Sequence, residues 1–180
     1  MSSENICSEL VGVAVTSLRL GIAEHMAGQV AEEKSIVSSM ASFVAADILD
    51  GAILRKYDMD TPIRRIADGV VDHLSVGRVM IEVARNNSSA RPYIGILATR
   101  AAIVGSLNAV HLARTGEVTK GRHKQKATNL ATAAFGIAAA SGNKPLTHIT
   151  GLFASVIAVS TAAHHFRGLG KRRDGVYREL

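Results

Sequence analysis

Six apolar stretches separated by short polar breaks make up most of the 180-residue chain. No stretch shows the alternation of apolar and polar positions that is typical of a half-buried strand, so the pattern predicts helices. The second stretch has about 19 residues and would extend about 28 Å as a helix, close to the thickness of a hydrocarbon core. The expected helices are Leu10–Ala27, Ile36–Leu54, Ile66–Ala84, Tyr93–Ala113, Ala127–Ala140 and Leu146–Phe166.

The breaks between these stretches carry residues that end helices. A polar segment follows Gly28, two asparagines and two serines follow Arg85, and Ser141 opens a Ser-Gly-Asn-Lys-Pro turn. No internal repeat or low-complexity tract interrupts the pattern. We therefore expect an all-α fold in which residues 1–180 form a single domain, an integral membrane bundle of six transmembrane helices.

The basic residues favour one side of such a bundle. If the N-terminus is cytoplasmic, most Lys and Arg residues fall in the breaks on that side, and four fall in the others. Those four are Lys34, Arg85, Arg91 and Lys144. This bias predicts both termini on the cytoplasmic side. Arg outnumbers Lys and Ala is abundant, as in GC-rich bacterial genomes, so we expect a bacterial cytoplasmic membrane.

Composition limits the possible binding partners, but it does not decide whether the bundle lies in water or in a membrane. The net charge is +6, but aromatics are only 4% of the chain, which disfavours a nucleic-acid surface. A lone cysteine excludes an intrachain disulfide. Several apolar stretches contain charged residues, which keeps a soluble helical bundle open as an alternative. Examples are Arg19 and Glu24 in the first stretch and Arg78 and Glu82 in the third.

Four aspartates flank the break after the second stretch. Asp47 and Asp50 are three residues apart, and Asp68 and Asp72 are four apart, so each pair shares one face of its helix. The first pair closes one helix and the second pair opens the next. Because a short turn makes these helices antiparallel neighbours, we expect the four carboxylates to converge near the cytoplasmic end.

Such a group of carboxylates needs a counter-charge. An all-carboxylate site favours hard cations such as Mg²⁺ or Mn²⁺, which commonly bridge phosphate oxygens. Gly51 would let a ligand approach the backbone, and Arg55 lies one turn further on, where it could pair with a phosphate. The ordinary alternative is that these aspartates form salt bridges at the surface. Two aspartate pairs around one loop favour the metal site over this alternative.

The stretch from Asp47 to Asp72 resembles the signature of the CDP-alcohol phosphatidyltransferase family, D-x-x-D-G-x-x-A-R followed by G-x-x-x-D-x-x-x-D. The aspartates, Gly51 and Arg55 match in register. Leu54 stands where the signature has Ala, and Arg64 stands where its second part begins with Gly. Thr16-Ser-Leu-Arg19 is similar to a T-x-x-R segment common near the family's N-terminus, and Lys124-Gln-Lys126-Ala-Thr128 is similar to a K-x-K-T segment.

The resemblance implies a transferase that moves a phosphatidyl group from a CDP-alcohol, typically CDP-diacylglycerol, to an acceptor hydroxyl and releases CMP. It implies that Asp47, Asp50, Asp68 and Asp72 bind two Mg²⁺ or Mn²⁺ ions and that Asp72 is also the general base. Gly51 and Arg55 would lie against the cytidine nucleotide. Homodimers are common in the family, and the sequence adds no independent sign of one.

The acceptor is expected to be a small polyol phosphate, such as glycerol 3-phosphate or inositol phosphate, or a lipid. Ile96-Leu-Ala-Thr-Arg100 is similar to a stretch of phosphatidylglycerophosphate synthases that contains an Arg-Glu pair, with Ala101 in place of the acid. Arg100, Arg78, Lys124 and Lys126 are the candidate acceptor-binding residues. Two alternatives stay open: Arg100 pairs with Glu82 inside the bundle, and the lysines are only part of the cytoplasmic charge bias.

The departures at Leu54 and Arg64 leave a second function open. A degenerate family member would bind a CDP-lipid or a membrane partner without turnover.

Overall fold

The computed structural model describes the backbone of residues 3–56, 62–115 and 122–171, and the side chains of residues 14, 17–49, 69–115 and 126–164. These residues form six α-helices and a 3-10 turn, and no strand occurs among them. The elements are α1 (Ser3–Ala31), α2 (Val37–Lys56), α3 (Pro62–Asn86), η1 (Ser88–Ala90), α4 (Arg91–Thr115), α5 (Arg122–Ala140) and α6 (Lys144–Lys171).

The all-α prediction is confirmed over the described residues. Each predicted stretch lies within one helix, except that the second starts at Ile36, one residue before α2 begins at Val37. The helices continue past the apolar stretches at most of their ends. Backbone hydrogen bonds extend a helix into polar residues as readily as through apolar ones, so hydropathy marks the centre of a helix better than its ends.

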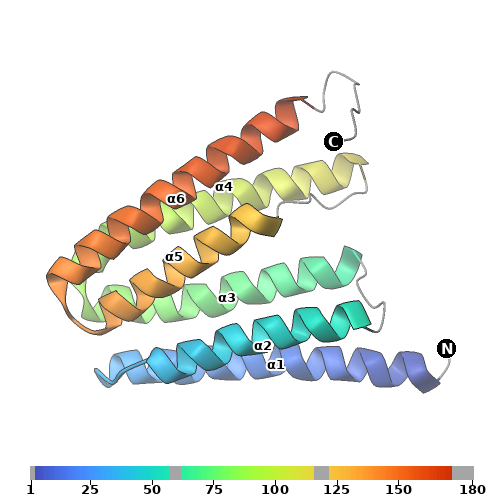
Figure 1. Cartoon of the computed structure of the whole chain (residues 1–180), viewed down its shortest axis with the longest axis horizontal. Helices are drawn as coiled ribbons and strands as arrows, with labels where there is room; N and C mark the ends of the chain where they lie inside the picture. Colours follow the sequence, from blue (N-terminus) through green and yellow to red (C-terminus); the bar gives the residue numbers. More distant parts are fainter. Residues whose placement is uncertain (1–2, 57–61, 116–121, 172–180) are drawn as a thin grey trace. The chain divides into compact units, whose positions relative to one another are not determined.

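The chain divides into two compact units. Unit 1 takes the described residues of 1–88 together with 136–143, and unit 2 takes those of 89–135 and of 144–180. In unit 1, α1 packs against both α2 and α3 (Figure 1). The buried positions of α1 include Ala23, Met26, Ala27 and Val30, which recur every three or four residues along one face. Small side chains on this face let the neighbouring helices approach closely.

Polar side chains satisfy the helix ends of unit 1. The Asn86 amide donates a hydrogen bond to the Val30 carbonyl at 2.7 Å, and the buried Asn87 amide donates one to the Ala139 carbonyl at 2.9 Å. Both carbonyls lie in the last turn of a helix, where no intrahelical donor remains. The two asparagines thus join α3 to the ends of α1 and α5.

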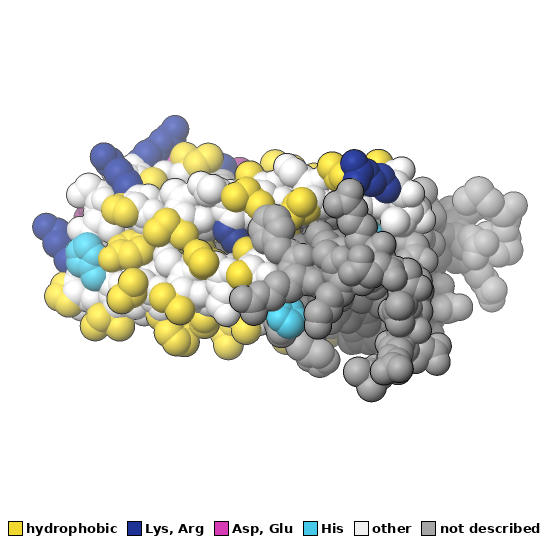
Figure 2. All heavy atoms as spheres, turned by 90° about the horizontal axis from the view of Figure 1, so that it is seen from above, with side chains coloured by type: hydrophobic (Ala, Val, Ile, Leu, Met, Phe, Trp, Pro, Cys, Tyr) yellow, Lys and Arg dark blue, Asp and Glu magenta, His cyan; other side chains and the backbone are white. Residues whose placement is uncertain are grey.

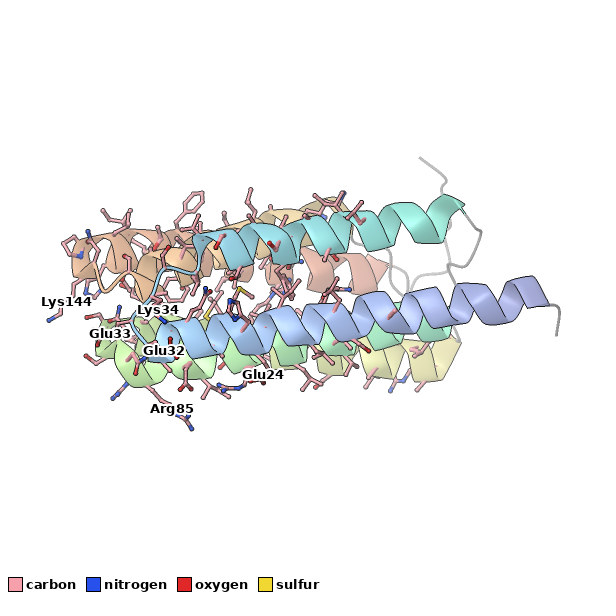
Figure 3. All side chains as sticks on the ribbon, turned by 90° about the horizontal axis from the view of Figure 1, so that it is seen from below. Glu24, Glu32, Glu33, Lys34, Arg85 and Lys144 are labelled. Carbon is pink, nitrogen blue, oxygen red and sulfur yellow. The ribbon has the colours of Figure 1, made fainter. Side chains whose placement is uncertain are left out.

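The turn between α1 and α2 is short and charged, with Glu32, Glu33 and Lys34 grouped there (Figure 3). Glu33 has φ 56°, and the Lys34 amide donates to the Gln29 carbonyl at 2.8 Å, which closes the helix with a left-handed residue. A hydrogen bond between Lys34 and Glu32, 2.6 Å long, lowers the pKa of Glu32 and raises that of Lys34. Both shifts favour the charged forms of Glu32 and Lys34.

In unit 2, α4 packs along α6. The Tyr93 ring makes edge contacts with Phe135 and His148, at centroid distances of 5.9 and 5.8 Å. The Tyr93 hydroxyl lies 3.0 Å from Nδ1 of His148. Gly151 allows this arrangement, because a Cβ atom there would lie 2.6 Å from the ring of Tyr93.

The described surface is unusually apolar for a water-soluble bundle. Large apolar side chains are exposed on all six helices, Ile149 at 68% and Phe153 at 62% among them. Several buried residues are instead small and polar, such as Ser39, Ser75 and Thr147. Figure 2 shows one face on which hydrophobic side chains are widespread and basic side chains stand mostly at the margins. This inverted distribution is typical of helices in lipid.

Two helical segments of the described chain are long and apolar enough to cross a membrane. They are Ser88–Thr115 and Lys144–His164. The apolar part of α2, Val37–Leu49, is shorter. By length and composition alone, the described residues therefore account for two of the six predicted spans.

We predict that Gly151→Ala destabilises the protein by about 1–3 kcal/mol, because the new methyl group overlaps the Tyr93 ring. Thermal unfolding in detergent measures the effect. Gly105→Ala is the matched control, since a Cβ at Gly105 meets nothing within 4 Å and Ala favours the helix. Equal midpoints for the two variants would contradict the close approach of Tyr93.

Candidate functional site

At one position along the bundle axis, α1, α2 and α3 carry charged residues next to the mostly small residues that they bury. In α1, Arg19 lies one turn before the buried Ala23. In α3, Asp72 lies one turn before the buried Ser75. Asp47 of α2 reaches the same level. Helical spacing therefore directs a cation and two carboxylates from three helices toward one place.

Arg19 brings the two carboxylates together. Its Nη2 atom lies 3.3 Å from Oδ1 of Asp47 and also contacts Oδ1 of Asp72. The guanidinium carbon lies 5.8 Å from the centre of the Phe43 ring, which is within range of a cation–π interaction. Arg19 is only 1% exposed. A buried cation is costly unless it is paired, and here both partners come from other helices.

The carboxylates themselves are more open than the guanidinium. The side chain of Asp47 is 56% exposed and that of Asp72 is 33% exposed. Each therefore contacts Arg19 and leaves part of its side chain open to another ligand. Carboxylate oxygens are the ligands that a hard divalent cation prefers.

The remaining signature residues lie on the same two helices. Asp50 is three residues after Asp47 in α2, and Asp68 is four residues before Asp72 in α3, so the helical register places each pair on one face. The side chains of Asp50, Gly51, Arg55 and Asp68 lie outside the described part, as do those of Leu54 and Arg64. Among the described side chains, no group of three His, Cys, Asp or Glu residues could hold a metal ion.

The structure changes one detail of the expected geometry. The aspartates were predicted to converge because α2 and α3 are neighbours joined by a short turn. The helix on which both pack is α1, and its Arg19 is the residue that Asp47 and Asp72 share. The convergence of these two residues therefore depends on a third helix.

Comparison with family models gives a match to CDP-alcohol phosphatidyltransferase over residues 5–163. The match covers the three helices of the aspartate site and most of the remaining chain. The chain belongs to the CDP-alcohol phosphatidyltransferase family. No curated protein and no solved structure matches it.

Membership makes the protein a transferase for substituted phosphate groups. The family transfers a phosphatidyl group from a CDP-alcohol donor to an alcohol acceptor and is generally dependent on divalent metal. Together with the two apolar segments, membership also indicates association with a membrane.

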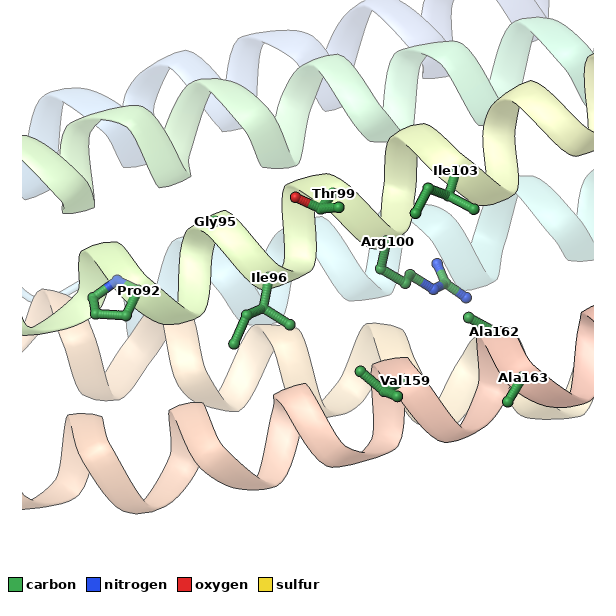
Figure 4. A pocket seen from close by; sticks show the side chains of 9 residues that line it. All are labelled: Pro92, Gly95, Ile96, Thr99, Arg100, Ile103, Val159, Ala162 and Ala163. Atoms are coloured by element: carbon green, nitrogen blue, oxygen red, sulfur yellow. The ribbon is translucent and has the colours of Figure 1, made fainter.

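A groove of about 580 Å³ lies between α4 and α6 in unit 2. Its walls are mostly apolar, with Ile96 and Ile103 from α4 and Val159 from α6, and Arg100 supplies its charge. The Arg100 side chain extends from α4 toward Ala162 of α6 (Figure 4). A cation in an apolar groove is a reasonable anchor for a phosphate group.

The other candidate acceptor residues have different surroundings. Arg78 belongs to unit 1, where its Nε atom donates to Glu24 at 3.1 Å and its Nη1 atom to Glu82 at 3.1 Å. Arg85 also donates to Glu82, at 3.0 Å, and Figure 3 shows Arg85 and Glu24 on the same surface of unit 1. Lys126 is exposed in the first turns of α5, and the side chain of Lys124 lies outside the described part.

Glu82 is thus already bonded to Arg78 and Arg85. Arg100 belongs to unit 2 and Glu82 to unit 1, so the alternative in which the two residues pair stays a prediction. Within unit 2, Arg100 lines the groove.

Arg19 is the site residue that the sequence prediction left out. Two signals could have found it: a cation within an apolar helix requires a partner, and Thr16-Ser-Leu-Arg19 matched a family segment. The helical repeat of Arg19 with Ala23, Met26 and Val30 would then have placed it on the buried face.

Proposed function

We propose that this enzyme transfers the phosphatidyl group of CDP-diacylglycerol to the hydroxyl of a small polyol phosphate, such as glycerol 3-phosphate or inositol phosphate, and releases CMP. The supporting observation is that Asp47 and Asp72, from the two signature helices, reach the same guanidinium group. They do so in a chain whose family match extends over residues 5–163.

Asp47, Asp50, Asp68 and Asp72 are proposed to hold two Mg²⁺ or Mn²⁺ ions. The described geometry supports this for Asp47 and Asp72, whose side chains are partly exposed and approach one another at Arg19. When bound, the ions would neutralise the pyrophosphate and stabilise charge on the departing CMP. Gly51 and Arg55 are proposed to contact the cytidine nucleotide, as the family signature implies.

Asp72 is proposed to be the general base. It accepts the proton of the acceptor hydroxyl while that oxygen forms a bond to the phosphorus of the phosphatidyl group, and the bond from this phosphorus to the CMP oxygen breaks. The ion pair with Arg19 orients the Asp72 carboxylate for this step. The proton then resides on Asp72 and the leaving group departs as CMP, so the step needs no further reactant.

The reaction is proposed to occur at the cytoplasmic face of a six-span bundle in a bacterial membrane. The exposed apolar side chains on all six helices support six spans, and the uneven distribution of Lys and Arg supports the orientation. The donor has lipid tails and a water-soluble head, so an interfacial site suits it. Because the family match runs through both compact units, we propose one functional domain over residues 1–180.

Arg100 is proposed to bind the phosphate of the acceptor, with Arg78, Lys124 and Lys126 as further candidates. The groove beside Arg100 supports its assignment. For Arg78, binding an acceptor would cost free energy, because the acceptor would compete with the hydrogen bonds of Arg78 to Glu24 and Glu82.

We predict CMP release when the purified protein is given CDP-diacylglycerol, Mg²⁺ or Mn²⁺, and either glycerol 3-phosphate or an inositol phosphate. Chromatographic detection of CMP measures it, with chelator as the control. CDP-lipid binding without CMP release on any acceptor would favour the non-catalytic alternative that Leu54 and Arg64 raise. Absence of both binding and release would contradict the proposed function.

We predict that Asp72→Asn lowers kcat by about 10²–10⁴-fold, because the acceptor loses its base, while much of the nucleotide binding remains. Asp50→Ala is the comparison variant and should lose both turnover and nucleotide binding. Turnover and CDP binding are measured on the same preparations. Wild-type turnover by Asp72→Asn would rule out its role as base.

We predict that Arg100→Met raises the KM for a phosphorylated acceptor by about 10–100-fold, the loss of one hydrogen-bonded charge. The KM for CDP-diacylglycerol should not change. An acceptor series with and without the phosphate group provides the control within one enzyme. An equal change in KM for acceptors with and without the phosphate would show that Arg100 does not bind the phosphate group.

A further inference from the structure

Arg19 is held at the aspartate site by its surroundings. It is 1% exposed, its guanidinium lies against Phe43, and it follows the buried face of α1. A side chain packed in this way has no path to solvent without opening the contacts of α1 with α2 and α3. Moving the guanidinium away from Asp47 and Asp72 would therefore require those contacts to open.

Asp47 and Asp72 repel each other as neighbouring anions, and their helices are held near one another chiefly through α1. The charge of Arg19 is what makes their proximity favourable in the protein as it is described. A divalent cation on their open side would remove the same repulsion. One set of carboxylates thus has two possible sources of positive charge.

We propose that Arg19 and the divalent cation are alternative counter-charges for Asp47 and Asp72, so that Arg19 keeps the site assembled when no metal is bound. The inference rests on the proposed function, because it takes these aspartates as metal ligands. Arg19 is here a positioning residue: it acts through the carboxylates. It also weakens metal binding, since its charge opposes that of the ion.

The proposal predicts a specific coupling between substitution and metal. Without metal, Arg19→Met leaves two partly buried carboxylates uncompensated, and Tm should fall by about 5–10 °C. With saturating Mn²⁺, the ion replaces the missing charge, and the fall should be less than about half as large. Arg19→Lys keeps the charge, so its Tm should depend on metal much as that of the wild type does.

Arg78→Met is the matched control. Arg78 is also an arginine of unit 1 that pairs with two carboxylates, Glu24 and Glu82, but neither carboxylate belongs to the aspartate signature. The Tm loss of this variant should be the same in chelator and in Mn²⁺. The experiment uses the full chain in detergent, with MnCl₂ as the only added ligand and Mn²⁺ binding followed by EPR.

A second measurement covers the case in which Arg19→Met does not fold. Arg19→Gln retains polar contacts with the carboxylates but not the charge, and its Kd for Mn²⁺ should be roughly tenfold lower than that of the wild type. An unchanged or higher Kd would overturn the inference. So would a Tm loss in Arg19→Met that is equal with and without Mn²⁺, or no loss at all.

The design separates this inference from the proposed function. If the wild type binds Mn²⁺ and the Arg19 variants show no coupling, only the alternative-charge inference fails. If EPR detects no Mn²⁺ binding to the wild type, the metal site of the proposed function fails, and the inference fails with it.

Discussion

A buried guanidinium between two carboxylates is the interaction on which the proposed active site depends. Arg19 enters from α1, while Asp47 and Asp72 enter from α2 and α3. Because α1 is the helix on which both others pack, this contact fixes the depth at which the signature aspartates meet. The packing of small residues further along α1 determines the spacing between the helices. The charged residues at the level of Arg19 are the ones proposed to take part in the reaction.

The same helices show why a membrane suits this site. Large apolar side chains are exposed on their outer surfaces, and two serines and one arginine are buried among the small and apolar side chains between them. In water the exposed apolar side chains would contribute little to folding, whereas in lipid their exposure costs little. The ion pair of Arg19 with Asp47 and Asp72 lies at the buried end of this guanidinium, where its charge is partly shielded from solvent. The chemistry of the family, which joins a lipid donor to an alcohol, uses both properties.

Much of the fold could be predicted from the sequence, because six apolar stretches with polar breaks leave few arrangements other than helices. The helix ends could not, since polar residues such as those of 3–9 extend α1 without a hydropathy signal. The spacing of Asp47, Asp50, Asp68 and Asp72 predicted two paired faces, and Asp47 and Asp72 do approach one another. The part played by Arg19 required the packing of α1, which no local pattern encodes. Nor did the sequence predict the groove at Arg100, because a groove depends on which small residues of α4 and α6 face each other.

The central claim is that aspartates from two different helices bind the same divalent ions. The most direct measurement is Mn²⁺ binding, followed by EPR, to the wild type and to the single variants Asp47→Ala in α2 and Asp72→Ala in α3. The account predicts that the wild type binds Mn²⁺ and that either substitution alone weakens binding by at least about tenfold. Wild-type affinity in one of the two variants would show that the helices do not share the ions, and would contradict the account.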